Sequence, residues 1–197
     1  MTEIAPLTPR RDVLAFLLNR RSRPAKTLGL PVPDRSTVDT LLQAAARSPD
    51  HGKLEPWRFI VLQRAACLRL ADLTALRGAE AGMDAEKVEK ARRSFAGAHL
   101  VVAVIAAPVA TDKVPDVEQI LSAGAVCLAL VNAGLAAGWG ANWLSGWMAM
   151  DREFLDRGLQ LEPHEFVAGF VHLGREGAVP PERPRPDLSR ITTWVSE

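Results

Sequence analysis

Apolar residues recur at helical spacing along most of the chain, and shorter apolar runs interrupt this pattern. The helical spacing predicts helices at residues 9–19, 36–47, 65–77, 84–95, 117–138 and 151–159. Runs rich in β-branched and aromatic residues predict strands at residues 58–62, 100–106, 140–144 and 166–173. Residues 100–106 are apolar throughout, so this strand should be buried on both faces. Helices thus predominate over four or five strands that share one sheet, and the expected fold class is α+β.

Several helix starts carry N-cap signals. Thr8 precedes a proline at the first helical position, and Ser36 has an acidic residue three positions later, as in a capping box. Asp84 and Asp151 stand directly before two further helical patterns. We expect these four side chains to cap their helices.

The stretch 117–138 is the longest apolar segment, and Gly124 is one of the many small residues within it. A bilayer, a globular core or a subunit interface would each suit such a helix. A membrane span needs roughly 20 apolar residues, and polar residues interrupt this stretch at Glu118, Gln119, Ser122 and Asn132. We therefore set the membrane aside, while a core helix and a dimer helix both stay open.

The composition changes at the C-terminus, where residues 175–197 form a proline-rich arm. Its last part, residues 191–195, has the character of a strand. A strand at the end of an extended arm needs an edge to pair with, and a neighbouring subunit could supply one.

Length and charge narrow the classes of function. With 197 residues the chain predicts one domain, 1–197, that ends in the arm. The 24 basic and 23 acidic residues nearly cancel, which gives no electrostatic argument for nucleic acid or an anionic membrane. The N-terminus has no signal-peptide pattern, and Cys67 and Cys127 form no C-x-x-C pair. We expect a cytoplasmic protein with buried thiols.

Two polar segments are candidates for chemistry. Arg20, Arg21 and Ser22 could hold a phosphate, but basic residues after a helix also complement its dipole, and taken alone the segment favours that structural interpretation. The loop 50–57 combines two acidic residues, a histidine and a lysine, and its Pro-Trp exit suggests a held shape. A functional loop and a merely solvated one stay equally open.

Other signatures are missing from the sequence. The four histidines show no metal-ligand spacing, Ser145 lacks the nucleophile elbow, and the Rossmann and P-loop fingerprints are absent. What remains is arginine, serine, glycine backbone and flat aromatics without an obvious acid–base pair. Such a set suits a cofactor that carries its own chemistry.

These segments, in this order, resemble the nitroreductase family of FMN-dependent oxidoreductases. The resemblance is carried by residues 19–22, 47–51 with 56–57, 122–124, 138–140 with 143 and 145–146, and 169–174. It implies an α+β sandwich with a central four- to five-stranded, mostly antiparallel sheet flanked by helices, in an intertwined homodimer with two FMN molecules at the subunit interface.

The resemblance also implies roles for particular residues. The FMN phosphate and ribityl end would be bound by Arg20, Arg21 and Ser22. The partner's flavin would be reached by Arg47 and His51, and the ring on the first subunit's side would lie against Trp143, Leu144 and Ser145. The nicotinamide nucleotide would lie near Ala133, Gly134, Leu135, Ala136, Ala137 and Gly138.

Two residues depart from the family pattern. Glu55 stands where glutamine usually precedes Pro-Trp, and a carboxylate close to the flavin would disfavour its anionic reduced form. Leu144 replaces an arginine found in some relatives. Both departures bear on the choice of substrate more than on the cofactor.

The leading hypothesis is an FMN-dependent oxidoreductase that takes electrons from NADH or NADPH. It would pass a hydride through flavin N5 to a nitroaromatic, quinone or similar small planar acceptor, in ping-pong order. The second hypothesis is a flavin-binding or structural homodimer, a carrier or sensor with little turnover. Neither involves a metal, and no side chain is a secure catalytic acid.

Overall fold

The computed structural model describes residues 6–197. Five antiparallel strands form the centre of the molecule. The strands are β1 (Leu28–Gly29), β2 (Trp57–Gln63), β3 (Leu100–Ala106), β4 (Gly140–Leu144) and β5 (Phe166–Glu176). The helices are α1 (Arg11–Asn19), α2 (Arg35–Ala45), α3 (Arg64–Glu80), α4 (Ala85–Ala96), α5 (Asp116–Ala136), α6 (Arg152–Leu159) and α7 (Leu188–Ile191). Three single 3₁₀ turns complete the described elements, namely η1 (Ala25–Thr27), η2 (His51–Lys53) and η3 (Trp147–Ala149).

The sheet has the order β1-β5-β3-β2, and β4 pairs with β5 as well. β5 can serve three partners because it is 11 residues long. His172 lies opposite Val101 of β3 and Asn142 of β4, while Gly29 of β1 pairs with Arg175 near the end of β5. All these pairings are antiparallel. The predicted α+β class and its antiparallel sheet of four to five strands are confirmed.

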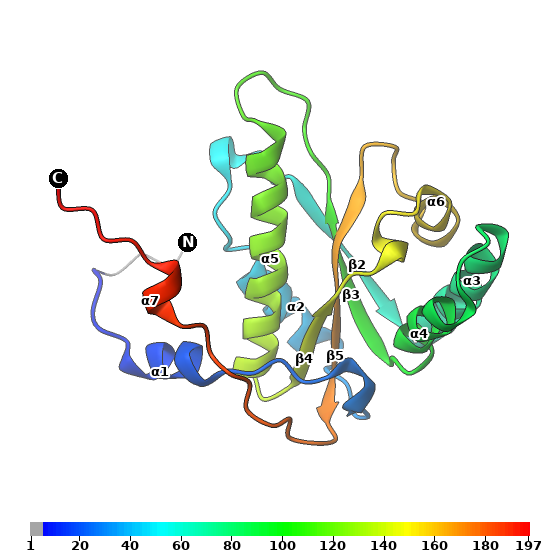
Figure 1. Cartoon of the computed structure of the whole chain (residues 1–197), viewed down its shortest axis with the longest axis horizontal. Helices are drawn as coiled ribbons and strands as arrows, with labels where there is room; N and C mark the ends of the chain where they lie inside the picture. Colours follow the sequence, from blue (N-terminus) through cyan, green and yellow to red (C-terminus); the bar gives the residue numbers. More distant parts are fainter. Residues whose placement is uncertain (1–5) are drawn as a thin grey trace.

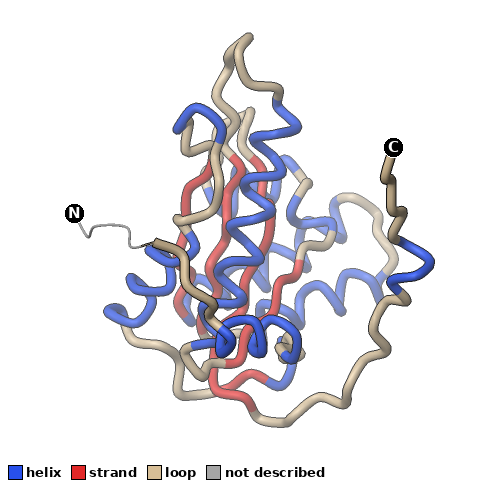
Figure 2. The backbone as a smooth tube through the Cα atoms, turned by 90° about the vertical axis from the view of Figure 1, so that its left-hand side faces the viewer, coloured by secondary structure: helices blue, strands red, loops and turns tan. Residues whose placement is uncertain are grey.

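Helices cover the two faces of this sheet (Figures 1 and 2). The α5 and α2 helices pack together on one face, and α3, α4 and α6 lie on the other. β3 contributes to both cores, since Val101, Ala103 and Ile105 belong to the α3 side and Val102 and Val104 to the α5 side. Every residue of β3 is buried, which confirms the prediction for this strand.

The long helix α5 is buried on one side only. Its residues Ala123, Val126, Cys127 and Leu130 are fully buried against the sheet, whereas Leu121 remains 67% exposed. By length and mean hydropathy, 1.7, the helix could cross a membrane. Its packing against β3, β4 and β5 makes it a core helix of this chain. Its other apolar side stays uncovered in the single chain, so the interface interpretation is still open.

The N-caps were predicted with mixed success. Asp84 and Asp151 accept hydrogen bonds from the backbone N–H groups of Lys87 (3.0 Å) and Phe154 (2.8 Å), which confirms both.

The two earlier cap predictions are wrong. α1 starts after Arg10, which makes no side-chain cap hydrogen bond, so Thr8 lies too far upstream to cap it. α2 is capped by Asp34, whose carboxylate accepts from the N–H of Thr37 at 2.8 Å. Ser36 already lies in the first turn and donates to Asp34. Asp34, two positions before Ser36, is therefore the N-cap of α2 that the capping-box pattern had assigned to Ser36.

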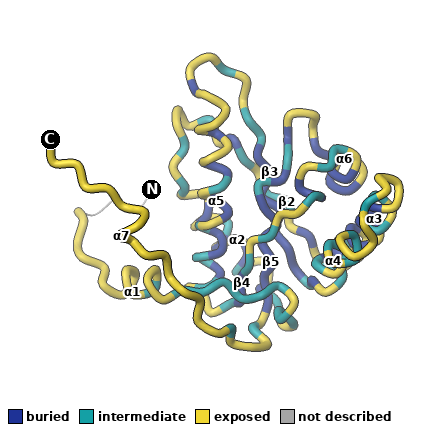
Figure 3. Tube along the Cα trace, in the orientation of Figure 1, coloured by how far each residue is buried: buried dark blue, intermediate teal, exposed yellow. Residues whose placement is uncertain are grey.

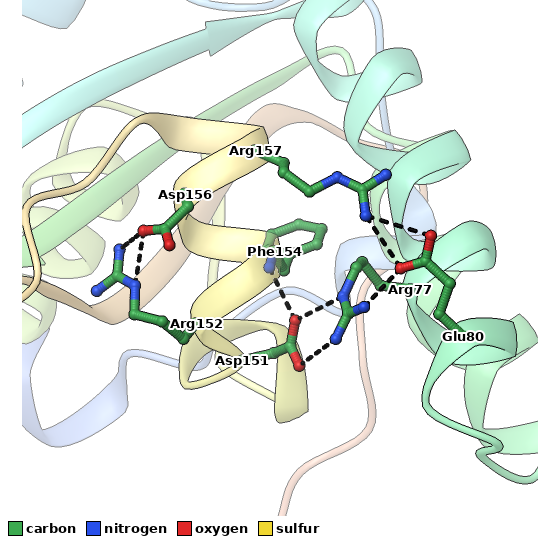
Figure 4. Close-up of polar contacts among 7 residues, drawn as sticks. All are labelled: Arg77, Glu80, Asp151, Arg152, Phe154, Asp156 and Arg157. Carbon is green, nitrogen blue, oxygen red and sulfur yellow. Dashed lines mark hydrogen bonds and ion pairs between the residues drawn. The ribbon is translucent and has the colours of Figure 1, made fainter.

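An ion-pair network joins α3 to the start of α6 (Figure 4). Arg77 donates to both carboxylate oxygens of Asp151, at 3.1 and 3.3 Å, and also to Glu80. Arg157 donates to Glu80 from the α6 side at 3.0 Å. The hydrogen bond from Arg77, more than any other contact, lowers the pKa of Asp151. One aspartate thus caps α6 and fastens it to α3.

Both ends of the described chain lie away from the body formed by the sheet and the helices on its two faces (Figure 3). No residue of α1 is buried, and Leu14 and Leu18 are 58% and 66% exposed. β5 continues to Glu176, so the arm starts later than residue 175. Ile191 belongs to the short helix α7, which Asp187 caps, and residues 192–195 form no strand within the described chain. The predicted strand at residues 191–195 would pair with a neighbouring subunit and stays a prediction. The prediction about an N-terminal leader concerns, in part, residues 1–5, which lie outside the described residues.

Candidate functional site

The basic segment after α1 is fastened to the edge strand β4. The N–H of Arg23 donates to the carbonyl of Ala141 at 2.9 Å, and the amide Nδ2 of Asn142 donates to the carbonyl of Arg23 at 2.7 Å. Residues 20–22 are therefore held beside β4, although more than a hundred positions separate the two segments. This contact brings the predicted phosphate segment to the strand that carries Trp143 and Leu144 and is followed by Ser145.

The arginines of this segment lie close together, and some of their buried donors are unpaired among the described residues. Arg20 donates through Nη2 to Ser22 Oγ at 2.8 Å. The Nε atoms of Arg20 and Arg21 are buried and have no hydrogen-bond partner among the described residues. Burial lowers the pKa of Arg20, and the like charges of Arg185 and the neighbouring arginines lower it further. Buried donors without acceptors are costly, so a phosphate here would relieve both the repulsion and the missing hydrogen bonds.

This arrangement bears on the two interpretations of the segment. Arg20 is the C-cap residue of α1, so its charge also lies at the negative end of the helix dipole. The unpaired donors of Arg20 and Arg21 nevertheless favour the binding interpretation.

A cavity of about 310 Å³ lies at the same place. It is lined by the three arginines together with Leu135 and Gly138 from the end of α5. The predicted nicotinamide stretch is thereby brought next to the basic segment. Within that stretch Gly134 is buried, and a side chain there would meet Leu173 and Ala141 at 3.0 and 3.2 Å. Its role is close packing of α5 on the sheet, whereas Ala136 and Ala137 are exposed.

β4 presents its side chains to opposite faces. Leu144 lines a second cavity, of about 620 Å³, together with Lys26 and residues of α4. Trp143 turns to the α5 face, where its indole Nε1 donates to the carbonyl of Ala168 at 3.2 Å. Gly169 leaves the space that the indole fills, because a side chain at that position would collide with it. Trp143 keeps 40% of its surface exposed, which a flat ligand could cover.

The loop 50–57 has the held shape that its sequence suggests. The carboxylate of Asp50 accepts from the N–H groups of Leu54 (3.2 Å) and Glu55 (2.7 Å). Gly52, Lys53 and Glu55 all have positive φ angles of 73°, 56° and 48°, which is a strained conformation for residues with a side chain.

Ser122 of α5 fastens both ends of this loop. Its hydroxyl accepts from Trp57 Nε1 at 3.1 Å and donates to the carbonyl of Pro49 at 2.7 Å. A strained loop that is fixed at both ends favours a functional role over a solvated one.

His51 lies far from the basic segment within one chain, and Arg47 lies between them, beside Leu128 and Asn132 of α5. His51 Nδ1 is 2.7 Å from the Oε2 atom of Glu118 in the first turn of α5, whereas the basic segment lies at Leu135 in its last turn. Seventeen residues separate these positions, roughly 25 Å along a helix axis. The structure therefore places His51, in η2, and the basic segment after α1 at opposite ends of α5 (Figure 1). A single chain does not bring the two together.

Three residues near the site escaped the sequence analysis. Glu118 was noted only as a polar interruption, Arg185 only as part of the proline-rich arm, and Lys26 not at all. No spacing rule connects positions so distant in sequence, so only the folded chain reveals them.

Comparison with known proteins identifies the family. A model of the nitroreductase family matches residues 18–175. The chain is 32% identical over 163 residues to the Escherichia coli K12 protein named "Putative NAD(P)H nitroreductase YdjA", covering 83% of this chain and 87% of that protein.

Solved structures agree in fold. A nitroreductase-like family protein from Bacillus cereus superposes with a TM-score of 0.77 at 17% identity, covering 96% of this chain and 99% of that one. A protein from Desulfovibrio desulfuricans, described as a nitroreductase in complex with FMN, gives a TM-score of 0.73 at 20% identity, covering 95% and 99%. These two structural similarities support the fold. The family model and the identity to YdjA also establish the family. This chain belongs to the nitroreductase family.

Proposed function

We propose that this chain is an FMN-dependent NAD(P)H oxidoreductase that reduces nitroaromatic, quinone or similar planar acceptors. Family membership, the name of the Escherichia coli relative and the FMN complex of a structural neighbour all support this activity. The observation that carries it is the pair of buried Arg20 and Arg21 Nε atoms without acceptors, beside a serine hydroxyl and next to β4.

The residues present fit FMN. Arg20, Arg21 and Ser22 would hold its phosphate, since guanidinium forks match phosphate oxygens. Trp143 would lie against the ring, whereas Leu144 points to the opposite face of the sheet. The chemistry that FMN supplies when bound is hydride transfer at N5, from the nicotinamide nucleotide to the acceptor in ping-pong order. The chain's own part is to bind and orient the ring and to keep water from it.

A homodimer is part of this proposal. α1, the outer side of α5 and the C-terminal arm expose apolar residues that a second copy would cover, and Leu14, Leu121 and Trp194 are 58%, 67% and 92% exposed. His51, which lies about 25 Å from the basic segment of its own chain, would then serve the FMN of the partner subunit, and so would Arg47. The arm would reach the partner as well. The buried free thiols of Cys67 and Cys127 support a reducing, cytoplasmic location.

Colour and reducibility test the proposal. The purified protein should bind FMN, and NADH or NADPH should bleach the bound flavin without oxygen. If no flavin is bound even after FMN is added, the oxidoreductase proposal fails. If flavin is bound but neither nucleotide reduces it, the protein is a flavin-binding dimer instead.

Arg20→Ala tests the phosphate assignment. Loss of a charge-assisted contact worth about 1.5–3 kcal/mol should raise the dissociation constant for FMN by about 10- to 150-fold. Arg35→Ala is the matched control, because that side chain is 95% exposed on α2. Equal FMN affinity in both variants would exclude Arg20 from the phosphate site.

A further inference from the structure

A histidine and a glutamate meet where the strained loop touches the first turn of α5. His51 Nδ1 lies 2.7 Å from Glu118 Oε2, and the two side chains keep 60% and 46% of their surface exposed. The Nε2 atom of the same ring has no hydrogen-bond partner within residues 6–197. The pair borders a hollow of about 520 Å³ that also contains Leu121 and Ser122. Glu118 therefore occupies one side of the imidazole and leaves the other side open.

Such a contact determines which ring nitrogen carries the hydrogen. A carboxylate accepts from Nδ1–H and cannot donate, so it keeps the hydrogen on Nδ1. Nε2 is then the atom that exchanges a proton with a ligand. Asp50 and Lys53 are the nearest charged residues in sequence, and neither competes for Nδ1, because Asp50 is engaged by backbone N–H groups of its own loop.

The loop itself limits how far His51 can move. Its backbone is fixed by Asp50 on the inside and by the hydroxyl of Ser122 at both ends. Three residues at positive φ follow within four positions of His51, a strain that persists only when the surrounding contacts impose it. Both the backbone and the ring of His51 are therefore held in place.

We propose that Glu118 is a positioning residue for His51, and that His51 Nε2 donates the proton that the acceptor needs. This inference rests on the proposed function, including the second subunit whose FMN His51 would face. No sequence motif includes Glu118, and its contact with His51 is seen only in the folded chain.

The step balances in atoms and electrons. The acceptor gains two electrons and one hydrogen as a hydride, and it needs one more proton to become the neutral reduced product. The N–H bond at Nε2 of the His51 imidazolium breaks and the new bond forms on the acceptor. The ring keeps its hydrogen on Nδ1, where it is donated to the carboxylate of Glu118. Water returns the lost proton to Nε2, since His51 is open to solvent.

The first test reads the histidine without any cofactor. Nitrogen-15 NMR of the flavin-free protein should show that the neutral form of the His51 ring carries its hydrogen on Nδ1, and His51→Gln assigns the signal. Glu118→Ala should shift the hydrogen towards Nε2, while Glu118→Gln, which keeps an acceptor oxygen, should restore Nδ1–H. Asp116→Ala is the matched control, because it removes another acidic residue from the same helical turn. An unchanged tautomer in Glu118→Ala overturns the positioning role.

The second test compares two acceptors in the reduced holoenzyme. Benzoquinone needs a proton with its electrons, whereas ferricyanide takes electrons alone. His51→Gln and Glu118→Ala should slow reoxidation by benzoquinone, by about 10²-fold for His51→Gln, and leave reoxidation by ferricyanide unchanged. Glu118→Gln should recover part of the rate. Equal slowing with both acceptors, or no slowing with benzoquinone, overturns the proton-donor role.

The two proposals fail in different ways. A wild-type protein that binds no FMN or resists both nucleotides refutes the proposed function, and the proton-donor role falls with it. The tautomer measurement still decides whether Glu118 positions His51. A yellow, reducible protein with insensitive variants refutes the inference alone.

Discussion

Gly169 on β5 is the position where one added methyl group would reach the proposed flavin contact. A Cβ atom there would collide with Trp143 Nε1, and it would lie 2.5 Å from Trp143 Cδ1 and 2.9 Å from Cys127 Sγ. Packed atoms do not approach so closely, and Gly169 is held in the sheet by its pairing with Val104 of β3. Gly169→Ala should therefore push the indole of Trp143 out of its place.

The cost follows from what the indole loses. Its hydrogen bond to the carbonyl of Ala168 is worth about 0.5–1.5 kcal/mol, and an overpacked site costs about 1–3 kcal/mol. Trp143 is 40% exposed and can swing towards solvent, which limits the overpacking. We expect a loss of about 2 kcal/mol in the free energy of unfolding.

Urea unfolding of the flavin-free variant measures this loss, and the near-ultraviolet circular dichroism of tryptophan reports the displaced ring. FMN added to the variant should show altered visible dichroism if Trp143 contacts the flavin. Gly29→Ala is the control, since a Cβ at that strand position meets nothing within 4 Å. A Gly169→Ala protein as stable as the wild type, with unchanged tryptophan dichroism, would refute the packing described for Trp143.

Three further predictions concern acid stability, the α6 cap and the dimer. Burial lowers the pKa of His172 to about 4 from 6.5, so the folded state binds fewer protons than the unfolded state between these values. The free energy of unfolding, measured by urea unfolding, should therefore fall by about 3 kcal/mol as the pH drops through that window. His172→Asn should reduce this pH-dependent loss. A loss of equal size in the wild type and the variant would exclude His172 as its source. Asp151→Ala should cost about 1 kcal/mol of stability through the lost cap, while Asp151→Asn should keep most of the cap and lose only the charge that faces Arg77, so equal thermal stability of the two variants would contradict the cap. Gly124→Leu should weaken both dimerisation, measured by sedimentation, and FMN retention, measured by flavin release. Gly124→Ala, whose Cβ meets Trp143 only at 3.9 Å, should leave both properties intact. Loss of one property without the other in Gly124→Leu would show that dimerisation and FMN binding are not coupled.

The periodic elements were predictable because burial imposes their patterns. β3 is apolar throughout and is buried on both faces, and the aspartates before α4 and α6 cap them as expected. β1 was missed because it has only two residues and exists through its pairing with the end of β5. A two-residue strand leaves no periodicity to detect.

The candidate site was predictable in parts but not as a whole. The Arg-Arg-Ser segment and Trp143 were found through a family resemblance, yet their proximity depends on the contact between Arg23 and Asn142. No local pattern encodes a contact across 119 positions. Glu118 was missed for the same reason, since its partner His51 lies 67 positions away. Long-range side-chain contacts are properties of the fold rather than of any sequence window.

The C-terminal arm touches the basic segment, and this contact links two equilibria. Arg21 donates to the carbonyl of Pro181, and Arg185 lies close enough to disfavour the charge on Arg20. A bound phosphate would turn that repulsion into a shared attraction, so the ligand should stabilise the docked arm. By thermodynamic reciprocity, the docked arm strengthens phosphate binding by the same factor. The proline-rich tail would then regulate how long the cofactor stays, although it contributes nothing to the core.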